Sequence, residues 1–130
     1  MSDGGRQYRN SKGGNAYPSF THGVRDGEYV FVSGQIAADK RGAPVALGDI
    51  EAETRAAMDL LGGVLAEFGL SYADLVKVGI FMTNLDEFDT MDAVYATYFP
   101  AGKVPARTCV EARRILSGCR IEIDGIARAR

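Results

Sequence analysis

The segment that decides the fold is residues 106–124, ARTCVEARRILSGCRIEID. Residue character alternates along 106–112 and again along 119–124, which predicts two strands whose side chains point alternately to the two faces of a sheet. Only a short loop separates them, so antiparallel pairing is expected to bring the two strands together. The polar side chains of each strand then share a face: Arg107, Cys109 and Glu111 in the first, and Arg120, Glu122 and Asp124 in the second.

Five more elements are expected before this segment. Aromatic and β-branched residues at 29–34 predict a strand, which forms a hairpin with the stretch before the turn at 25–27. A 3.6-residue apolar stripe predicts a helix that begins at Asp49 and ends at Gly69. The apolar run 75–82 predicts a strand buried on both faces, and 86–99 a second helix.

Two helices can cover only one face of a sheet with this many strands. The other face is expected to carry the Arg107, Cys109 and Glu122 side chains beside apolar ones. A half-apolar sheet face that no helix covers is a candidate subunit interface.

Composition is that of one ordinary domain. The chain has 130 residues, 46% hydrophobic and 25% charged, and a net charge of −2, so neither nucleic acid nor a membrane is expected as a partner. The polar, glycine-rich residues 1–15 predict a flexible leader and 16–130 a single domain, in a cytoplasmic protein without a secretory signal. Cys109 and Cys119 lack the spacing of a zinc site, so no metal and two reduced thiols are expected.

Arg107 and Glu122 are the residues best suited to chemistry. A guanidinium binds a carboxylate through two parallel hydrogen bonds, and a carboxylate can hold or deprotonate a water molecule. Ser33 and Gly34 end a strand on small residues, where backbone N–H groups can face an anion. Taken from the residues alone, a structural ion pair between Arg107 and Glu122 is the favoured interpretation.

Several motifs resemble the Rid family, also called the YjgF family, of reactive-intermediate deaminases. The similarity covers about residues 20–128. The motifs that carry it are Pro105–Glu111 with Ile121–Asp124, Val32–Gln35, Gly48–Thr54, Phe81–Thr83 and Tyr95–Pro100.

The resemblance implies an α+β, chorismate-mutase-like two-layer sandwich of order β-β-α-β-α-β-β, assembled as a barrel-like homotrimer with an active site at each subunit interface. It also implies hydrolysis of enamine and imine intermediates of 2-amino acids, such as 2-aminoacrylate, to a keto acid and ammonia without a cofactor. Arg107 would clamp the substrate carboxylate with the Gly34 N–H, and Glu122 would orient water and take its proton. Cys109 and Ser33 would line the pocket.

The sequence departs from the family pattern at two positions. The ungapped count places Phe20 where family members have a tyrosine, although Tyr17 lies close by, and Asp92 stands where many members have asparagine. A more hydrophobic or larger acid, such as a 2-aminomuconate-like one, therefore becomes an alternative substrate. His22 is either an acid–base group at the pocket rim or a solvated loop histidine, and Cys109 either a redox-sensitive thiol or a pocket-lining side chain.

Two rival functions remain open from the sequence. A small-acid-binding or chaperone-like trimer would need the Arg107 clamp but not Glu122. A ribonuclease would draw on the basic residues of the first fifteen, yet no aromatic-interleaved basic surface accompanies them.

Overall fold

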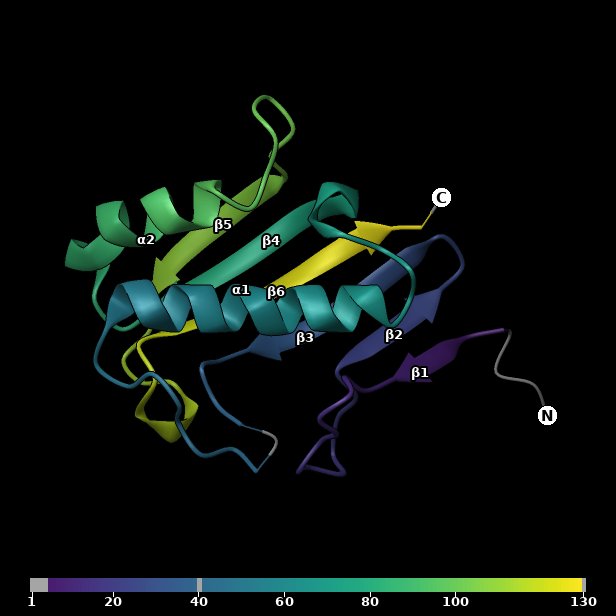
Figure 1. Cartoon of the computed structure of the whole chain (residues 1–130), viewed down its shortest axis with the longest axis horizontal. Helices are drawn as coiled ribbons and strands as arrows, with labels where there is room; N and C mark the ends of the chain where they lie inside the picture. The colour runs from purple at the N-terminus through teal and green to yellow at the C-terminus, as the bar shows by residue number, and fades with distance from the viewer. Residues whose placement is uncertain (1–4, 40, 130) are drawn as a thin grey trace.

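In the computed structural model, which describes residues 5–39 and 41–129, one six-stranded sheet carries two helices (Figure 1). The sheet order is β1-β2-β3-β6-β4-β5. The strands are β1 (Gln7–Arg9), β2 (Gly23–Asp26), β3 (Tyr29–Gln35), β4 (Leu75–Met82), β5 (Ala106–Glu111) and β6 (Ile121–Arg128). The helices are α1 (Ile50–Ala66) and α2 (Phe88–Ala96), with 3-10 turns at Tyr72–Asp74, Leu85–Glu87 and Leu116–Gly118. The expected α+β class is confirmed, and parts of the expected leader (1–4) and domain (40 and 130) lie outside the described residues.

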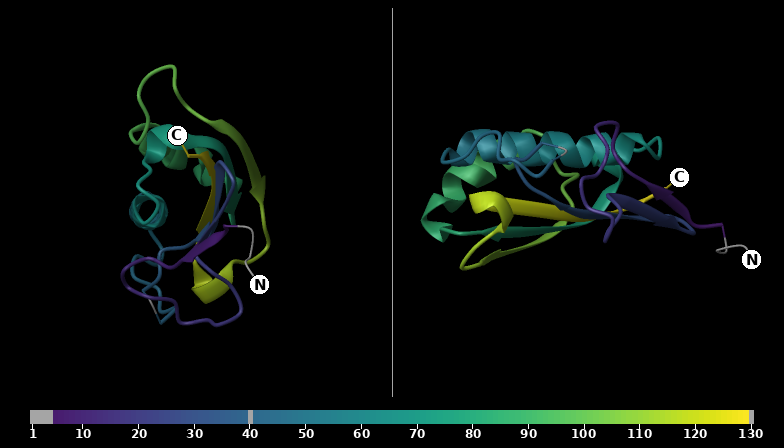
Figure 2. Two further views of the ribbon diagram at one scale, coloured as in Figure 1. Left: turned by 90° about the vertical axis from the view of Figure 1, so that its right-hand side faces the viewer. Right: turned by 90° about the horizontal axis from the view of Figure 1, so that it is seen from below.

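Both helices lie on the same face of the sheet, as expected, and the opposite face is bare (Figure 2). Alternate residues of β3, β4 and β6 point toward the helices, so a single apolar layer forms between them. The largest fully buried side chains of this core include Met58, Leu61, Leu65, Ile80, Met82, Met91, Ile121 and Ile123. Burying each such side chain stabilises the fold by about 1.5–3 kcal/mol relative to leaving it exposed.

The start and end of α1 follow the expected signals. Asp49 is the N-cap, and its carboxylate accepts a hydrogen bond from the Ala52 N–H at 3.2 Å. Beyond the helix, Gly69 has a φ of +71°, a conformation that glycine adopts without steric cost. These two residues explain why the helix begins and ends close to the positions that the sequence indicates.

The strand order differs from the expected antiparallel pairing of the last two strands. Helix α2 connects β4 to β5, and a strand–helix–strand unit places its two strands parallel, as observed. Strand β5 therefore lies at the edge beside β4, whereas β6 is inserted antiparallel between β3 and β4. The loop between β5 and β6 consequently crosses β4 rather than forming a hairpin.

Strand β4 has the expected bounds but is buried on one face only. Val78, Ile80 and Met82 lie in the core, whereas Lys77 and Phe81 are half-buried on the face without helices. The continuous apolar run arises because Phe81 belongs to an uncovered face that is itself apolar.

The N-terminal residues also differ from the expected flexible leader. Residues 7–9 form β1, which pairs antiparallel with β2. The Asn10 side-chain oxygen accepts a hydrogen bond from the His22 N–H at 2.9 Å, and the Ser11 N–H donates to the His22 ring at 3.0 Å. Backbone pairing and short polar contacts order this segment without a hydrophobic core of its own.

The bare face of the sheet is rich in exposed apolar side chains. Tyr29, Phe31 and Val110 are 42%, 47% and 42% exposed, and Ile126 lies beside Phe31 in the β3–β6 register. Glu122 and Asp124 of β6 belong to the same face, because Ile121 and Ile123 alternate with them into the core. The expectation of a half-apolar face without helix cover is therefore confirmed for β3 and β6.

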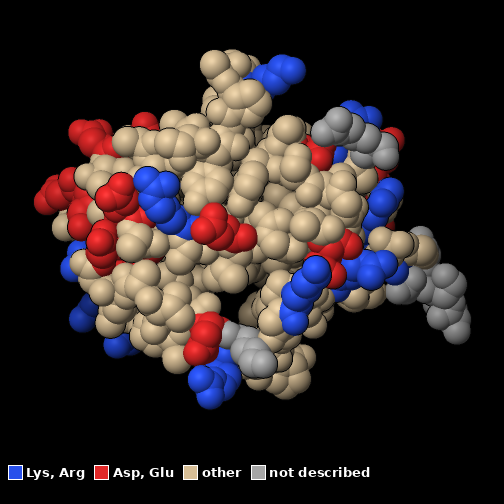
Figure 3. All heavy atoms as spheres, in the orientation of Figure 1, with Lys and Arg blue, Asp and Glu red and all other residues tan. Residues whose placement is uncertain are grey.

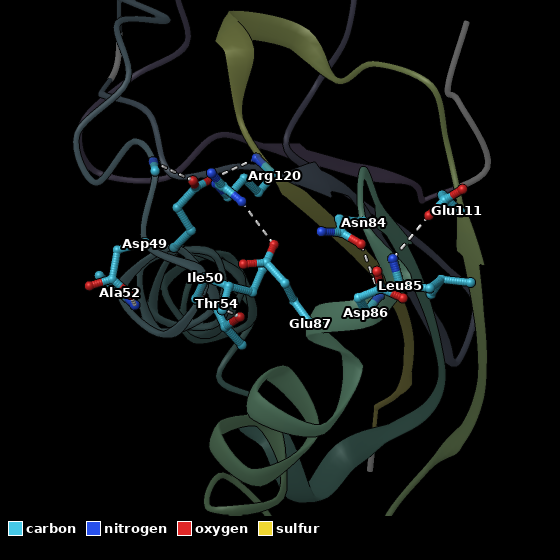
Figure 4. A network of polar contacts seen from close by, with 12 residues as sticks. Asp49, Ile50, Ala52, Thr54, Asn84, Leu85, Asp86, Glu87, Glu111 and Arg120 are labelled. Atoms are coloured by element: carbon cyan, nitrogen blue, oxygen red, sulfur yellow. Dashed lines mark hydrogen bonds and ion pairs between the residues drawn. The ribbon is translucent and has the colours of Figure 1, made fainter.

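A polar network fixes the loop that leads into β6 (Figure 4). The Arg120 guanidinium pairs with the Glu87 carboxylate at 3.0 Å, and the Arg120 N–H donates to Glu53 at 2.7 Å. Glu53 is fully buried and also accepts from the Gly48 N–H at 3.0 Å. One buried carboxylate thus joins the beginning of α1 to Arg120, two residues before Glu122.

Candidate active site

Glu122 lines a cavity of about 500 Å³. The other walls come from the N-terminal loop, the loop after β3, and the flank of α1, and Figure 3 shows the surface hollowed below α1. Among the expected site residues, Tyr17, Phe20 and Gly34 line this cavity together with Glu122. The cavity wall is mainly apolar.

The Glu122 carboxyl is half-buried, and this burial raises its pKa above the ordinary glutamate range. The negative charge of Asp124, two residues along the same face, acts in the same direction. A carboxylate with a raised pKa is a better proton acceptor than an ordinary surface glutamate.

Gly34 approaches Glu122 too closely to carry a side chain. A Cβ at Gly34 would lie 2.6 Å from the carboxyl carbon of Glu122. Because Gly34 lies within the irregularity of the β3–β6 register between Val32 and Gln35, its peptide stands beside the carboxylate rather than in the regular ladder. The absence of a side chain leaves this peptide open to the cavity.

Both aromatic candidates of the N-terminal loop reach the cavity. The rings of Tyr17 and Phe20 stack with centroids 6.1 Å apart, and Phe20 contacts the His22 ring at 5.9 Å. The Tyr17 hydroxyl lies against Gly42 of the loop after β3, closing this side of the cavity. The structure therefore brings both Phe20 and Tyr17 to the wall.

His22 also lines the cavity, and its ring is held by the N-terminal segment. Since the Ser11 N–H donates to Nδ1, that nitrogen accepts a hydrogen bond and the neutral ring carries its proton on Nε2. Burial lowers the pKa of His22, which favours this neutral form.

Ser33 does not line the cavity, contrary to expectation. Its hydroxyl donates to the Thr21 carbonyl at 2.6 Å, and its backbone N–H donates to the His22 carbonyl. Ser33 therefore ties β3 to the N-terminal loop, because its side chain turns to the nearest free carbonyl.

Arg107 lies on the opposite, helix-covered side of the sheet. Its guanidinium donates to Asp92 at 2.6 Å and lies 5.2 Å and 5.1 Å from the ring centres of Phe88 and Tyr95. All three partners belong to α2. Cys109, two residues along β5, packs against the core on this same side. The expectation that Arg107 and Cys109 occupy the bare face is therefore wrong.

Burial raises the pKa of the Cys109 thiol, and the nearby positive charge of Arg107 only partly opposes this effect. The thiol is consequently protonated at neutral pH, which favours a lining role over a reactive thiolate. Cys109 and Cys119 are both free.

Arg107 and Glu122 do not meet within one chain. Arg107 is in register with the core residue Val78 of β4, whereas Glu122 is in register with Phe81, which points to the other face. The expected proximity of the two side chains is wrong, and so is the alternative of an ion pair between them, since β4 separates their strands. The carboxylate partner of Arg107 is Asp92.

Sequence reasoning missed this arrangement around Arg107. Phe88, Asp92 and Tyr95 are spaced four and three residues apart, which places them on one side of α2. The Tyr95 hydroxyl is buried without a hydrogen-bond partner among the described residues, and burial raises its pKa to about 12. The signal available in the sequence was Asp92, a charged residue between two aromatic residues on one side of the predicted helix.

Two further findings concern the described residues as a whole. No group of three or more His, Cys, Asp or Glu side chains there is arranged to hold a metal ion. None of the helices in 5–39 and 41–129 has the length and apolar character needed to cross a membrane.

The fold defines a two-layer α+β protein in which polar groups flank both faces of one sheet. Residues 14–129 match the family model described as Endoribonuclease L-PSP. A 2-iminobutanoate/2-iminopropanoate deaminase of Salmonella typhimurium is 34% identical over 110 residues, covering 83% of this chain and 85% of the relative. The chain belongs to this family, the YjgF/Rid family.

Two solved structures from Escherichia coli are similar over nearly the whole chain. The YjgF gene product superposes with a TM-score of 0.84 at 29% identity, covering 95% of this chain and 99% of its own. TdcF with bound serine superposes with a TM-score of 0.83 at 28% identity, covering 95% and 98%. The family expectation from the sequence motifs is confirmed.

Proposed function

We propose that the chain is an enamine/imine deaminase that hydrolyses 2-imino acids to keto acids and ammonia. In this proposal its active site is completed in a homotrimer by Arg107 of one subunit and Glu122 of a neighbouring subunit. The observation that carries the proposal is the placement of these two residues on opposite faces of one sheet. A site that uses both must draw them from two chains.

The bare sheet face is suited to such an assembly. Tyr29, Phe31 and Val110 expose apolar surface on the same face of the sheet as Glu122, and burying apolar surface drives association by about 25 cal/mol per Å². A second subunit seated there would cover these side chains and bring its own β5 edge, with Arg107, toward Glu122. The solvent-exposed side of the Arg107–Asp92 pair would then face the cavity of the neighbouring subunit.

The chemistry needs little beyond positioning. The carbon of an imine is already electrophilic, so the protein must hold the substrate and aim a water molecule. Arg107 would bind the substrate carboxylate, and the Gly34 N–H would support it. Glu122, whose pKa is raised by burial, would take the proton from the attacking water. Retention of this carboxylate favours catalysis over simple binding of small acids.

The cavity supports a larger substrate as a second candidate. Its volume of about 500 Å³ exceeds what a three-carbon acid fills and lies within the range of about 300–1,000 Å³ typical of pockets for drug-sized ligands. Phe20 and Tyr17 give it an apolar wall. A 2-imino acid with a long or unsaturated side chain, including a 2-aminomuconate-like one, would place that chain against these rings.

The proposal is tested by mixing two inactive variants. Iminopyruvate, generated in the assay by a serine dehydratase, is hydrolysed faster in the presence of the wild-type chain, and Arg107→Ala and Glu122→Gln each lose this acceleration. Co-expression of the two variants restores about a quarter of the wild-type sites, because random trimers pair an intact Arg107 with an intact Glu122 at that frequency.

The matched control is the double variant co-expressed with either single variant, which contains no complete site in any arrangement. Recovery in the first mixture but not in the second supports the shared site. An absence of recovery from well-folded, co-assembled trimers would contradict it, and no acceleration by the wild type would contradict the deaminase itself.

A further inference from the structure

Arg107 already holds a carboxylate in the protein. Its Nη1 donates to Asp92 Oδ1 at 2.6 Å. The rings of Phe88 and Tyr95 also pack against the guanidinium. The Arg107 side chain is 23% exposed and that of Asp92 is 46% exposed, so the pair borders solvent. The described residues give the Asp92 carboxylate no other side-chain hydrogen bond.

This pairing changes the charge that a substrate meets. Arg107 and Asp92 together are neutral, and Glu122 adds one negative charge to the completed site. A keto acid or a neutral imine brings a carboxylate and makes the site more negative, which is unfavourable because like charges repel. A protonated imine with its carboxylate has no net charge, so it enters without this cost.

We propose that Asp92 binds the protonated imine nitrogen of the substrate, an inference that rests on the deaminase function proposed above. In a 2-imino acid the carboxylate and the C=N carbon are adjacent. A carboxylate held by the remaining N–H groups of Arg107 therefore places the nitrogen beside the guanidinium, where Asp92 presents its second oxygen. Arg107 recognises the anion, and Asp92 recognises the neighbouring cation.

The contact would also assist the reaction. The iminium ion is more electrophilic than the neutral imine, and a fixed negative charge beside the nitrogen favours the protonated form. Water attacks the iminium carbon as Glu122 takes its proton, a C–O bond forms, and the C=N electron pair moves to nitrogen. Glu122 returns the proton to nitrogen and then takes the hydroxyl proton as the C–N bond breaks. The departing ammonia takes this second proton from Glu122, so that keto acid and ammonium ion are released.

The test separates substrate binding from turnover with the Asp92→Asn variant. Asparagine keeps the shape and can still accept from Arg107, but it removes the negative charge. We expect kcat for iminopyruvate to fall about 10- to 100-fold. Binding of pyruvate, which has the carboxylate but no nitrogen, becomes several-fold tighter because Arg107 is no longer neutralised. The matched control is Asp89→Asn, an exposed aspartate on the same helix, which leaves both quantities unchanged.

Opposite changes in kcat and in pyruvate affinity distinguish this role from its alternatives. If Asp92 only competed with the substrate for Arg107, both turnover and pyruvate binding would improve, and if it only supported Arg107, both would worsen. Either result overturns the inference, as does unchanged kcat in the variant. A wild-type chain without imine turnover overturns the proposed function, and the inference with it.

Discussion

Gly34 and Glu122 face each other across the β3–β6 pair with no room between them for a methyl group. A Cβ at Gly34 would lie 2.6 Å from the Glu122 carboxyl carbon and 2.9 Å from its Cγ. The atoms in contact belong to the mobile end of the Glu122 side chain, so this end moves if the space is taken. The glycine therefore fixes the position of the carboxylate.

We expect Gly34→Ala to lower kcat/KM for iminopyruvate by about 10- to 100-fold, because it displaces the proposed base from the water that it holds. The free energy of unfolding should change by less than about 1 kcal/mol, since a flexible side chain can move aside. Steady-state kinetics and urea denaturation measure the two quantities. A fold that collapses, or an activity that persists, would show that the contact has another role.

The adjacent glycines of α1 predict opposite effects on stability. A Cβ at Gly62 would collide with the Tyr72 ring and hydroxyl, which donates to the Met58 carbonyl at 2.7 Å. Gly62→Ala should therefore destabilise the fold by about 1–3 kcal/mol. A Cβ at Gly63 would have no neighbouring atom within 4 Å, so Gly63→Ala should stabilise the helix by about 0.5–1 kcal/mol. Urea denaturation of both variants would refute this explanation if the two changes had the same sign.

Gly63 also gives a test of substrate size, because it lines the cavity. In Gly63→Leu the added side chain begins at a cavity-lining position where a Cβ has no neighbour within 4 Å. We expect kcat/KM for the imino acid derived from phenylalanine to fall about 10-fold, with a smaller loss for iminopyruvate. Gly63→Ala serves as the control. Equal losses for both substrates would mean that large side chains bind elsewhere.

The acid limb of the pH profile should report Glu122. Burial and the Asp124 charge both raise its pKa, and the proposed base acts only when deprotonated, so kcat/KM rises with pH through a value above the ordinary glutamate range. Asp124→Asn removes the charge but keeps the oxygen that accepts from the Gly79 N–H at 3.0 Å. The pKa of Glu122 then falls, and the acid limb moves to lower pH. A limb that stays in place or moves upward would assign it to another group.

Local signals in the sequence were sufficient for most elements. The Asp49 cap, Gly69 and the apolar run 75–82 placed α1 and β4 because each depends on residues close in the chain. Strand order depends instead on how the connections run. The sequence 106–124 reads like a hairpin, yet α2 commits β5 to parallel pairing with β4, and β6 takes the central position.

The faces of β5 could not be assigned from polarity. Its Ala, Thr and Val residues look like the inner face, but Val110 is 42% exposed while Arg107 lies under α2. The position of β5 at the sheet edge explains why its polar residue faces the helix. The aromatic rings of α2 and the Asp92 carboxylate bind the Arg107 guanidinium there. Glu122 was correctly placed on the bare face because Ile121 and Ile123, on either side of it, are unambiguous core residues.

The placement of Arg107 and Glu122 on the two sides of one sheet has a kinetic consequence. If each active site joins two chains, activity per subunit is a binding isotherm in the protein's own concentration. Specific activity falls when the protein is diluted below the dissociation constant of the assembly. A chain defective at one of these residues inactivates one of the two active sites to which it contributes. The catalytic rate and the abundance of the protein would then be coupled by the geometry of a single β-sheet.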